Sequence, residues 1–156
     1  MTARKRTRFD TLLATFDAFY LALAALPDER IREEARRYGQ TKQQTEQWLS
    51  EKKVTRGQLA EGWLQGLREI PEGFGGYPCA IRPQVIAAYY AALEQEYPQF
   101  LEQEAAKLQK VLNRGKIRTE REYYLIRNLV DQLEGKPEHK ERLCRYYTLL
   151  EHFESR

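Results

Sequence analysis

Apolar residues recur at intervals of three and four along almost the whole chain, and this spacing limits the fold more than any other feature. From Phe9 to Leu26 it gives a wide apolar stripe of the kind that a helix buries against its neighbours. The same spacing returns in several segments after Pro83, and no segment alternates between apolar and polar residues as a half-buried strand does. The sequence therefore predicts an all-α protein.

Capping residues divide the first 70 residues into four short helices. Asp28 is the expected N-cap of the second helix, and Gly39 is its expected C-cap. Thr41 and Thr55, each with a glutamine three residues later, form capping boxes that begin the third and fourth helices. Later in the chain, Pro98 either kinks one helix or begins the next. The four helices are expected over residues 9–26, 29–38, 42–52 and 56–70.

The segment from Pro71 to Pro83 contains three prolines and three glycines, so no long regular element is expected there. Its aromatic residues Phe74 and Tyr77 indicate that the segment packs against the protein and is not a free tether. Short connectors between the later helices favour antiparallel neighbours. We predict a helical unit over residues 1–70 that resembles a helix-turn-helix domain, a linker over 71–82, and an antiparallel helical bundle over 83–156.

Three pairs of adjacent tyrosines occur inside predicted helices, at positions 89/90, 123/124 and 146/147. Neighbouring residues on a helix point about 100° apart, so both rings of a pair do not enter the core together. We expect one ring of each pair in the core and the other at its wet margin, where a phenol suits.

The composition is that of a soluble globular protein, with 42% hydrophobic and 31% charged residues in a chain of 156. No apolar run approaches the roughly 20 residues that cross a bilayer, and the basic N-terminus lacks the apolar core of a secretory signal. Cys79 and Cys144 are far apart and have no CxxC companion, so the sequence indicates neither a disulfide nor a zinc site. We expect a cytoplasmic protein with no membrane segment.

Residues with the sizes that a DNA-reading motif requires lie between Ile31 and Leu67. A glycine four residues after an alanine allows one helix to end in a left-handed turn while the next crosses closely over the alanine. The residues in question are Ala35, Tyr38, Gly39, Thr45, Trp48 and Leu49. Over residues 29–68 this arrangement resembles the helix-turn-helix of phage Cro and repressor proteins. The resemblance implies that the helix over 42–52 lies in the major groove of DNA.

The resemblance also assigns roles to individual side chains. Glutamine can bond in a bidentate way to adenine, lysine to guanine or phosphate, and threonine to phosphate or a thymine methyl. The expected base-contacting residues are Thr41, Lys42, Gln43 and Gln47, and those packing behind them are Ala35, Tyr38, Gly39, Trp48 and Leu49. The expected contacts to the DNA backbone come from Arg4, Lys5, Arg6, Arg8, Lys52, Lys53 and Arg56.

Three residues depart from the family pattern. Gln40 stands where an apolar residue is usual, Thr45 replaces a buried Val or Ile, and Glu46 adds negative charge beside phosphates. The alternative is an ordinary helical hairpin in which Gly39 and Thr41 are only caps and Trp48 belongs to the core. Charge favours the DNA interpretation weakly, because residues 1–68 carry 13 Lys and Arg against nine Asp and Glu.

Catalytic motifs are absent from the sequence. His139 and His152 are the only histidines, and on a helix His139 does not share a face with Cys144. The GFGG sequence at 73–76 lacks the GK[ST] ending of a phosphate-binding loop, and no metal-ligand spacing occurs. We expect no enzymatic activity, no metal and no cofactor.

Two functions therefore remain from the sequence alone. One is a DNA-binding regulatory protein that reads double-stranded DNA with helix 42–52 and dimerises, because one short helix reads too few base pairs. The other is a non-catalytic all-α module that binds another protein, such as an adaptor, inhibitor or immunity-type protein. In either case residues 83–156 are expected to supply the contact with a second copy or a partner.

Overall fold

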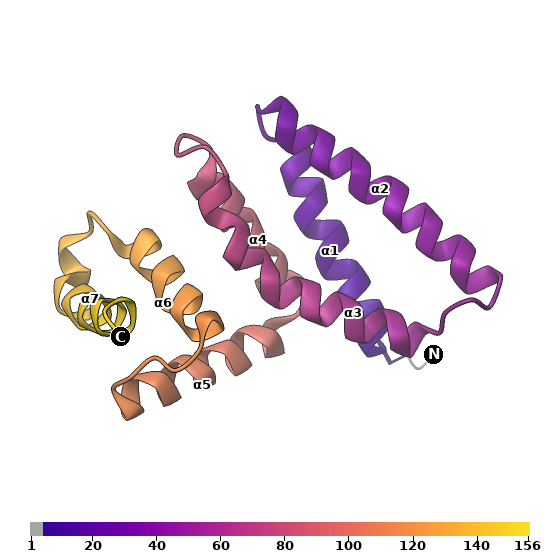
Figure 1. Cartoon of the computed structure of the whole chain (residues 1–156). Helices are drawn as coiled ribbons and strands as arrows, with labels where there is room; N and C mark the ends of the chain where they lie inside the picture. Colours follow the sequence, from indigo (N-terminus) through magenta and orange to yellow (C-terminus); the bar gives the residue numbers. More distant parts are fainter. Residues whose placement is uncertain (1–4) are drawn as a thin grey trace.

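The computed structural model describes residues 5–156, which form α-helices and short 3₁₀ helices and no strand (Figure 1). The elements are α1 (Arg8–Ala24), α2 (Glu29–Ser50), α3 (Arg56–Glu69), η1 (Ile70–Gly76), α4 (Arg82–Glu96), α5 (Pro98–Arg114), α6 (Glu120–Leu133), η2 (Pro137–His139) and α7 (Lys140–Glu154). The predicted all-α class is confirmed. In the described part of the chain, no helix combines the length and the apolar character needed to cross a bilayer.

Most helix ends lie where the capping residues predict them. The Asp28 carboxylate accepts a hydrogen bond from the backbone N–H three residues later, at 3.1 Å, and so begins α2. Thr55 and the glutamine three residues on form a reciprocal capping box at the start of α3. Pro98 occupies the first position of α5, so it begins a helix and does not kink one. Gly115 ends α5 in the left-handed region, with φ 74°.

The turn predicted at Gly39 is wrong. Residues 29–50 form one uninterrupted helix, in which Thr41 is an interior residue and not an N-cap. Gly39 keeps helical dihedrals, since the described glycines with positive φ are Gly115 and Gly135. A glycine inside a helix costs only about 1 kcal/mol relative to alanine, and the residues around Gly39 are mostly good helix formers. Continuing the helix through Gly39 adds one hydrogen bond per residue, which offsets that cost.

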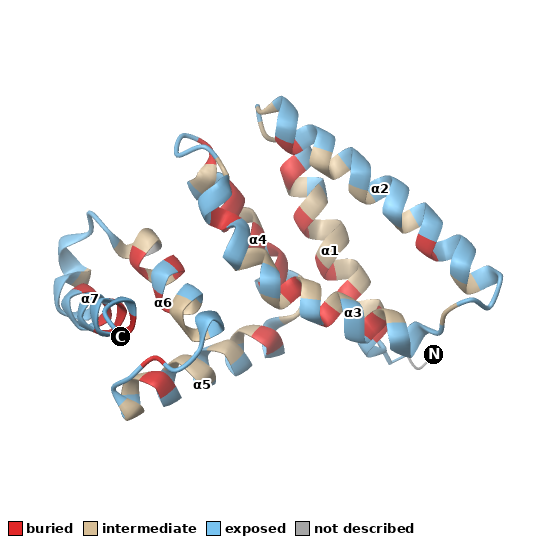
Figure 2. Cartoon of the chain, viewed as in Figure 1, coloured by how far each residue is buried: buried red, intermediate tan, exposed pale blue. Residues whose placement is uncertain are grey.

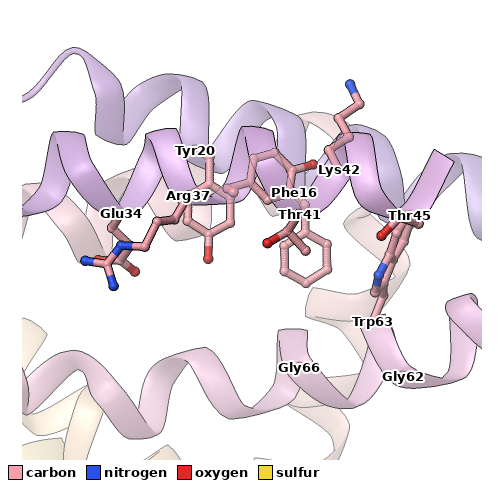
Figure 3. A pocket seen from close by; sticks show the side chains of 11 residues that line it. Phe16, Tyr20, Glu34, Arg37, Thr41, Lys42, Thr45, Gly62, Trp63 and Gly66 are labelled. Carbon is pink, nitrogen blue, oxygen red and sulfur yellow. The ribbon is translucent and has the colours of Figure 1, made fainter. Parts of the chain in front are cut away.

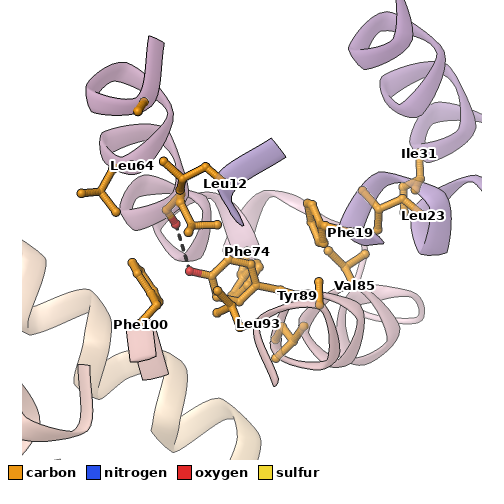
Figure 4. Packing of buried hydrophobic residues seen from close by; sticks show 14 of the residues in the cluster. Leu12, Phe19, Leu23, Ile31, Leu64, Phe74, Val85, Tyr89, Leu93 and Phe100 are labelled. Atoms are coloured by element: carbon orange, nitrogen blue, oxygen red, sulfur yellow. Dashed lines mark hydrogen bonds between the residues drawn. The ribbon is translucent and has the colours of Figure 1, made fainter. Parts of the chain in front are cut away.

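Two clusters of buried side chains organise the molecule, and they divide within α5 and not at the predicted linker over 71–82. The first cluster lies where α1 packs against α2, α3 and α4, and Phe74 of η1 is fully buried in it (Figures 2 and 4). The second cluster begins with Val111 near the end of α5 and is enclosed by α6 and α7. The proline- and glycine-rich segment is therefore part of the first packing unit, as its aromatic residues indicate.

Two of the three tyrosine pairs behave as predicted. In the third pair Tyr123 is half-buried and Tyr124 is 37% exposed, so neither ring is buried in the core. Tyr89 is 2% exposed whereas Tyr90 is half-buried, and Tyr146 is 2% exposed whereas Tyr147 is 42% exposed. The buried Tyr89 hydroxyl donates to the backbone carbonyl of Leu67 at 2.9 Å, drawn as a dashed line in Figure 4. A buried phenol with a partner for its hydroxyl keeps its apolar ring in the core at little cost.

Candidate functional site

The four residues expected to contact DNA bases lie on the second half of α2 and do not share one open surface. Thr41 and Lys42 line a groove beside α1, and the Lys42 Nζ pairs with the carboxylate of Asp17 at 3.1 Å. Gln43 and Gln47 are exposed, and the Gln47 side-chain amide donates to Glu51 Oε1 at 3.0 Å. Without a turn at Gly39, no separate short helix presents these side chains to a DNA groove.

The residues expected to contact the DNA backbone gather near the start of α1 and α3, but several have partners within the chain. Arg6 forms an ion pair with Glu96 of α4 at 2.9 Å, and the Lys53 Nζ pairs with Glu51 at 2.9 Å. The Arg56 guanidinium lies over a phenylalanine ring of α1, 5.3 Å from its centre. The remaining residues of this set are Lys5, Arg8 and Lys52, which are exposed, and Arg4, which is outside the described residues.

The residues expected to pack behind the DNA-reading helix have mixed surroundings. Ala35 and Leu49 are half-buried, and the Tyr38 ring stacks on Tyr20 with 4.3 Å between ring centres. Gly39 is exposed. Trp48 is 39% exposed, so the prediction that Trp48 is a core residue is wrong. Trp48 lies three positions beyond the buried Thr45, which on a straight helix turns it about 60° away from the inward-facing line.

The structure instead forms an open groove of about 400 Å³ between α2 and α3, with α1 as its floor (Figure 3). Its surface is mostly apolar because four aromatic side chains from three helices meet there. Phe16 and Tyr20 come from α1, Tyr38 from α2, and Trp63 from α3. The other lining residues are Glu34, Arg37, Thr41, Lys42, Thr45, Gly62 and Gly66.

On the α3 side of the groove, two glycines leave the helix backbone without covering side chains. Gly62 and Gly66 are four residues apart, so they lie on one face of α3, and Figure 3 shows both on the ribbon that faces the aromatic side chains. A Cβ added at Gly62 would meet nothing within 4 Å, and one at Gly66 would meet only the Phe16 ring at 3.9 Å. The groove therefore exposes helix backbone that a larger side chain would cover.

Polar groups along the α2 side fix the aromatic walls. Asp17 accepts a hydrogen bond from the Tyr38 hydroxyl at 2.5 Å and also pairs with Lys42. Burial, and then the hydrogen bond to Asp17, raise the pKa of Tyr38 above its ordinary value of 10.0, so the phenol stays neutral and donates. Arg37 is exposed at the rim, and it forms no hydrogen bond or ion pair with any described residue. The groove thus offers one uncommitted positive charge.

The described residues hold no group of three or more His, Cys, Asp or Glu side chains that is placed to bind a metal ion. Cys79 and Cys144 are exposed free thiols. The groove itself presents aromatic rings, exposed helix backbone and charged side chains.

Sequence reasoning missed most of the residues that line the groove. One signal was present, because glycine, tryptophan and glycine at 62, 63 and 66 combine exposed backbone with a large ring on neighbouring faces of one helix. The contributions of Phe16 and Tyr20 carried no such signal, since their spacing matches the core stripe of α1.

Comparison of the chain with protein-family models, with curated proteins and with solved structures gave no match.

Proposed function

We propose that this protein is a non-catalytic interaction module that binds an amphipathic helix of a partner protein in the groove between α2 and α3. The observation that carries the proposal is the pairing of an aromatic floor with an α3 side that has no side chains at positions 62 and 66. Helices approach one another most closely where small residues expose the backbone, and apolar anchors at helical spacing fill such grooves.

The length of the groove favours a helix over a small molecule. Its lining on α2 runs from Glu34 to Thr45, which at a rise of 1.5 Å per residue is about 16 Å, or three helical turns. Figure 3 shows the lining side chains of α2 spread over this distance, from Glu34 to Thr45. A helix of about 11 residues matches that length.

The surroundings of α2 support the same proposal. Of the 22 residues of α2, only Ile31 and Thr45 are buried, and Figure 2 shows the helix mostly in the colour of exposed residues. A helix of this length ordinarily buries a continuous stripe against its neighbours. A partner helix beside α2 would cover Tyr38 and Thr41, which the chain itself leaves partly open.

The charged side chains along the groove indicate which residues the partner helix carries. Glu34 accepts hydrogen bonds from the Tyr77 hydroxyl at 2.9 and 3.0 Å, and Lys42 is paired with Asp17, so both side chains have partners within the chain. Arg37 is the uncommitted charge on the groove. We infer that the bound helix carries apolar residues at spacings of three and four and an acidic residue that faces Arg37.

A displayed library of amphipathic helices, selected on the whole protein, tests the proposal. Enriched sequences should share apolar residues at helical spacing with an acidic residue beside them, and the synthetic peptides should bind in fluorescence anisotropy. Gly62→Leu should weaken their binding by at least about tenfold, because the new side chain fills the groove. Gly62 is exposed with open space around it, and leucine is the better helix former, so the variant should fold at least as well as the parent.

Matched variants separate the groove from the rest of α2. Gly39→Leu makes the same substitution in equally open space outside the groove and should leave peptide binding unchanged. Arg37→Glu should weaken binding of the acidic peptides, whereas Arg30→Glu should not. If no helix is enriched while random duplex DNA binds at low salt, or if the peptides bind Gly62→Leu and the parent equally, the proposal fails.

A further inference from the structure

We propose that a second, smaller cavity binds a small aromatic carboxylate, and that Arg68 is the residue that binds its carboxylate group. This cavity has a volume of about 140 Å³ and lies where the two hydrophobic clusters meet. Arg68 is two positions beyond Gly66 on α3, which turns it about 200° around the helix from the groove. The cavity is therefore a separate site from the groove between α2 and α3.

Residues from several elements form its wall, and most are apolar. Tyr89 and Leu93 come from α4, Phe100 from α5, and Leu125 from α6. Tyr89, Leu93 and Phe100 are almost fully buried, and Figure 4 shows Phe100 at the side of the first cluster and Tyr89 and Leu93 in its middle. These walls suit a flat apolar body.

Arg68 is the polar feature of the cavity that its surroundings do not satisfy. Its Nε atom is buried and has no hydrogen-bond partner, and its guanidinium forms no ion pair with a described residue. A buried donor without a partner is costly, and more so when it belongs to a charged group. An anion in the cavity removes that cost, and a carboxylate matches the planar guanidinium in a bidentate way.

The other polar side chains of the wall already have protein partners. The Tyr89 hydroxyl donates to Leu67, and the Asn128 amide donates to the carbonyl of Pro71 at 2.9 Å. Glu104 is held by Lys107 at 3.0 Å, so its negative charge is offset within α5. Among the described residues, Arg68 Nε is the buried side-chain atom that lacks a hydrogen-bond partner, so the unmet requirement in this cavity is for an acceptor.

The volume limits the size of the ligand. A cavity of about 150 Å³ lined by apolar side chains is large enough to bind benzene. The present cavity of about 140 Å³ therefore accommodates one aromatic ring, with the carboxylate directed toward Arg68. We assign the ligand to the class of monocyclic aromatic carboxylates, for which benzoate is the probe.

Isothermal titration calorimetry of the full chain with benzoate, and with its neutral isostere benzamide, tests the assignment. Benzoate should bind with one saturable site per chain, and benzamide should bind at least about tenfold more weakly, because hydrogen bonds to charged partners are the stronger ones. Perturbation of the Asn128 side-chain amide signals in NMR spectra should saturate at the same benzoate concentrations, which places the ligand in this cavity.

Arg68→Met keeps the apolar stem and removes the charge, and it should lower benzoate affinity by at least about tenfold. The variant should fold normally because Arg68 makes no bond that the substitution breaks. Arg142→Met, at an exposed arginine of α7 outside the cavity, is the matched control and should not change binding. Equal affinity of Arg68→Met and the parent, equal binding of benzoate and benzamide, or heats that do not saturate would each overturn the assignment.

Discussion

Replacing Gly39 with alanine distinguishes a continuous α2 from a helix-turn-helix by the sign of a stability change. In a continuous helix, alanine at this position removes the conformational freedom that glycine has in the unfolded chain. In a left-handed turn, the same substitution forces an alanine into a conformation that costs roughly 1–2 kcal/mol. The two structures therefore predict opposite effects on the free energy of unfolding.

The surroundings of Gly39 allow the change in the free energy of unfolding to be calculated, because few other effects compete with helix propensity there. A Cβ at this position meets no atom within 4 Å, so the substitution neither clashes with a neighbour nor gains buried contact. What remains is helix propensity, for which alanine exceeds glycine by about 0.8–1.0 kcal/mol. We expect Gly39→Ala to raise the free energy of unfolding by about 1 kcal/mol, which raises Tm by about 2–4 °C in a chain of this size.

Urea unfolding followed by tryptophan fluorescence measures this change where it occurs. The two tryptophans, Trp48 on α2 and Trp63 on α3, both belong to the N-terminal half, so their emission follows the packing unit that contains Gly39. The midpoint should rise while the slope of the transition stays constant. Gly115→Ala is the control of opposite sign, because Gly115 has φ 74° and alanine there should lower stability. Gly115 lies beside the second cluster, so the unfolding of this variant is followed by circular dichroism and not by tryptophan fluorescence. A lower midpoint for Gly39→Ala would refute the continuous helix and restore the predicted turn.

Three further predictions concern the first cluster. Tyr89→Phe should lower the free energy of unfolding by about 1–3 kcal/mol in urea titrations, because it leaves the buried Leu67 carbonyl without a donor, and Pro71, four residues on, has no N–H to offer. Burial raises the pKa of Tyr89 above its ordinary value of 10.0. The contribution of the Tyr89 hydroxyl to stability is therefore complete below pH 10 and is lost as the pH rises further. Above pH 10, the urea midpoints of the parent should fall more steeply than those of Tyr89→Phe. Thr55→Ala should cost about 1 kcal/mol in the same assay by removing the N-cap of α3, and an unchanged midpoint would contradict the capping box.

Helix content and most helix ends were predictable because they depend on short stretches of sequence. Asp28 and Thr55 cap the helices that follow them, and Pro98 begins α5, since each acts on backbone groups within one turn. Helical geometry also predicted that only one ring of the pairs 89/90 and 146/147 would be buried in the core.

The conformation of a glycine was not predictable from its identity. Gly115 and Gly135 adopt positive φ after a helix, whereas Gly39 continues one. Gly135 is followed closely by Pro137, which prevents continuation, but Gly39 is followed by eleven residues without proline or glycine that extend the helix. A single glycine therefore ends a helix only where the next residues also favour an ending.

The candidate groove was not predictable for a different reason, since it depends on how three helices lie relative to one another. Phe16 and Tyr20 follow the same spacing as the buried residues of α1, and nothing in that spacing marks them as only partly covered. Their exposure depends on α2, which packs on α1 but makes little contact with α3. Helix packing of this kind is set by side chains that are distant in the sequence.

The failure of the predicted turn and the presence of the groove have one cause. A turn at Gly39 would direct residues 42–52 across α1, so that Trp48 and Leu49 would cover the side chains of the first helix, as the helix-turn-helix packing requires. In the continuous α2 these residues lie further along the same axis, and Trp48 remains 39% exposed. Phe16 and Tyr20, which are only partly buried, then line the space between α2 and the glycines of α3. The unbroken helix at Gly39 thus leaves the groove uncovered by residues 42–52, and a variant that restored a turn there would be expected to close the groove.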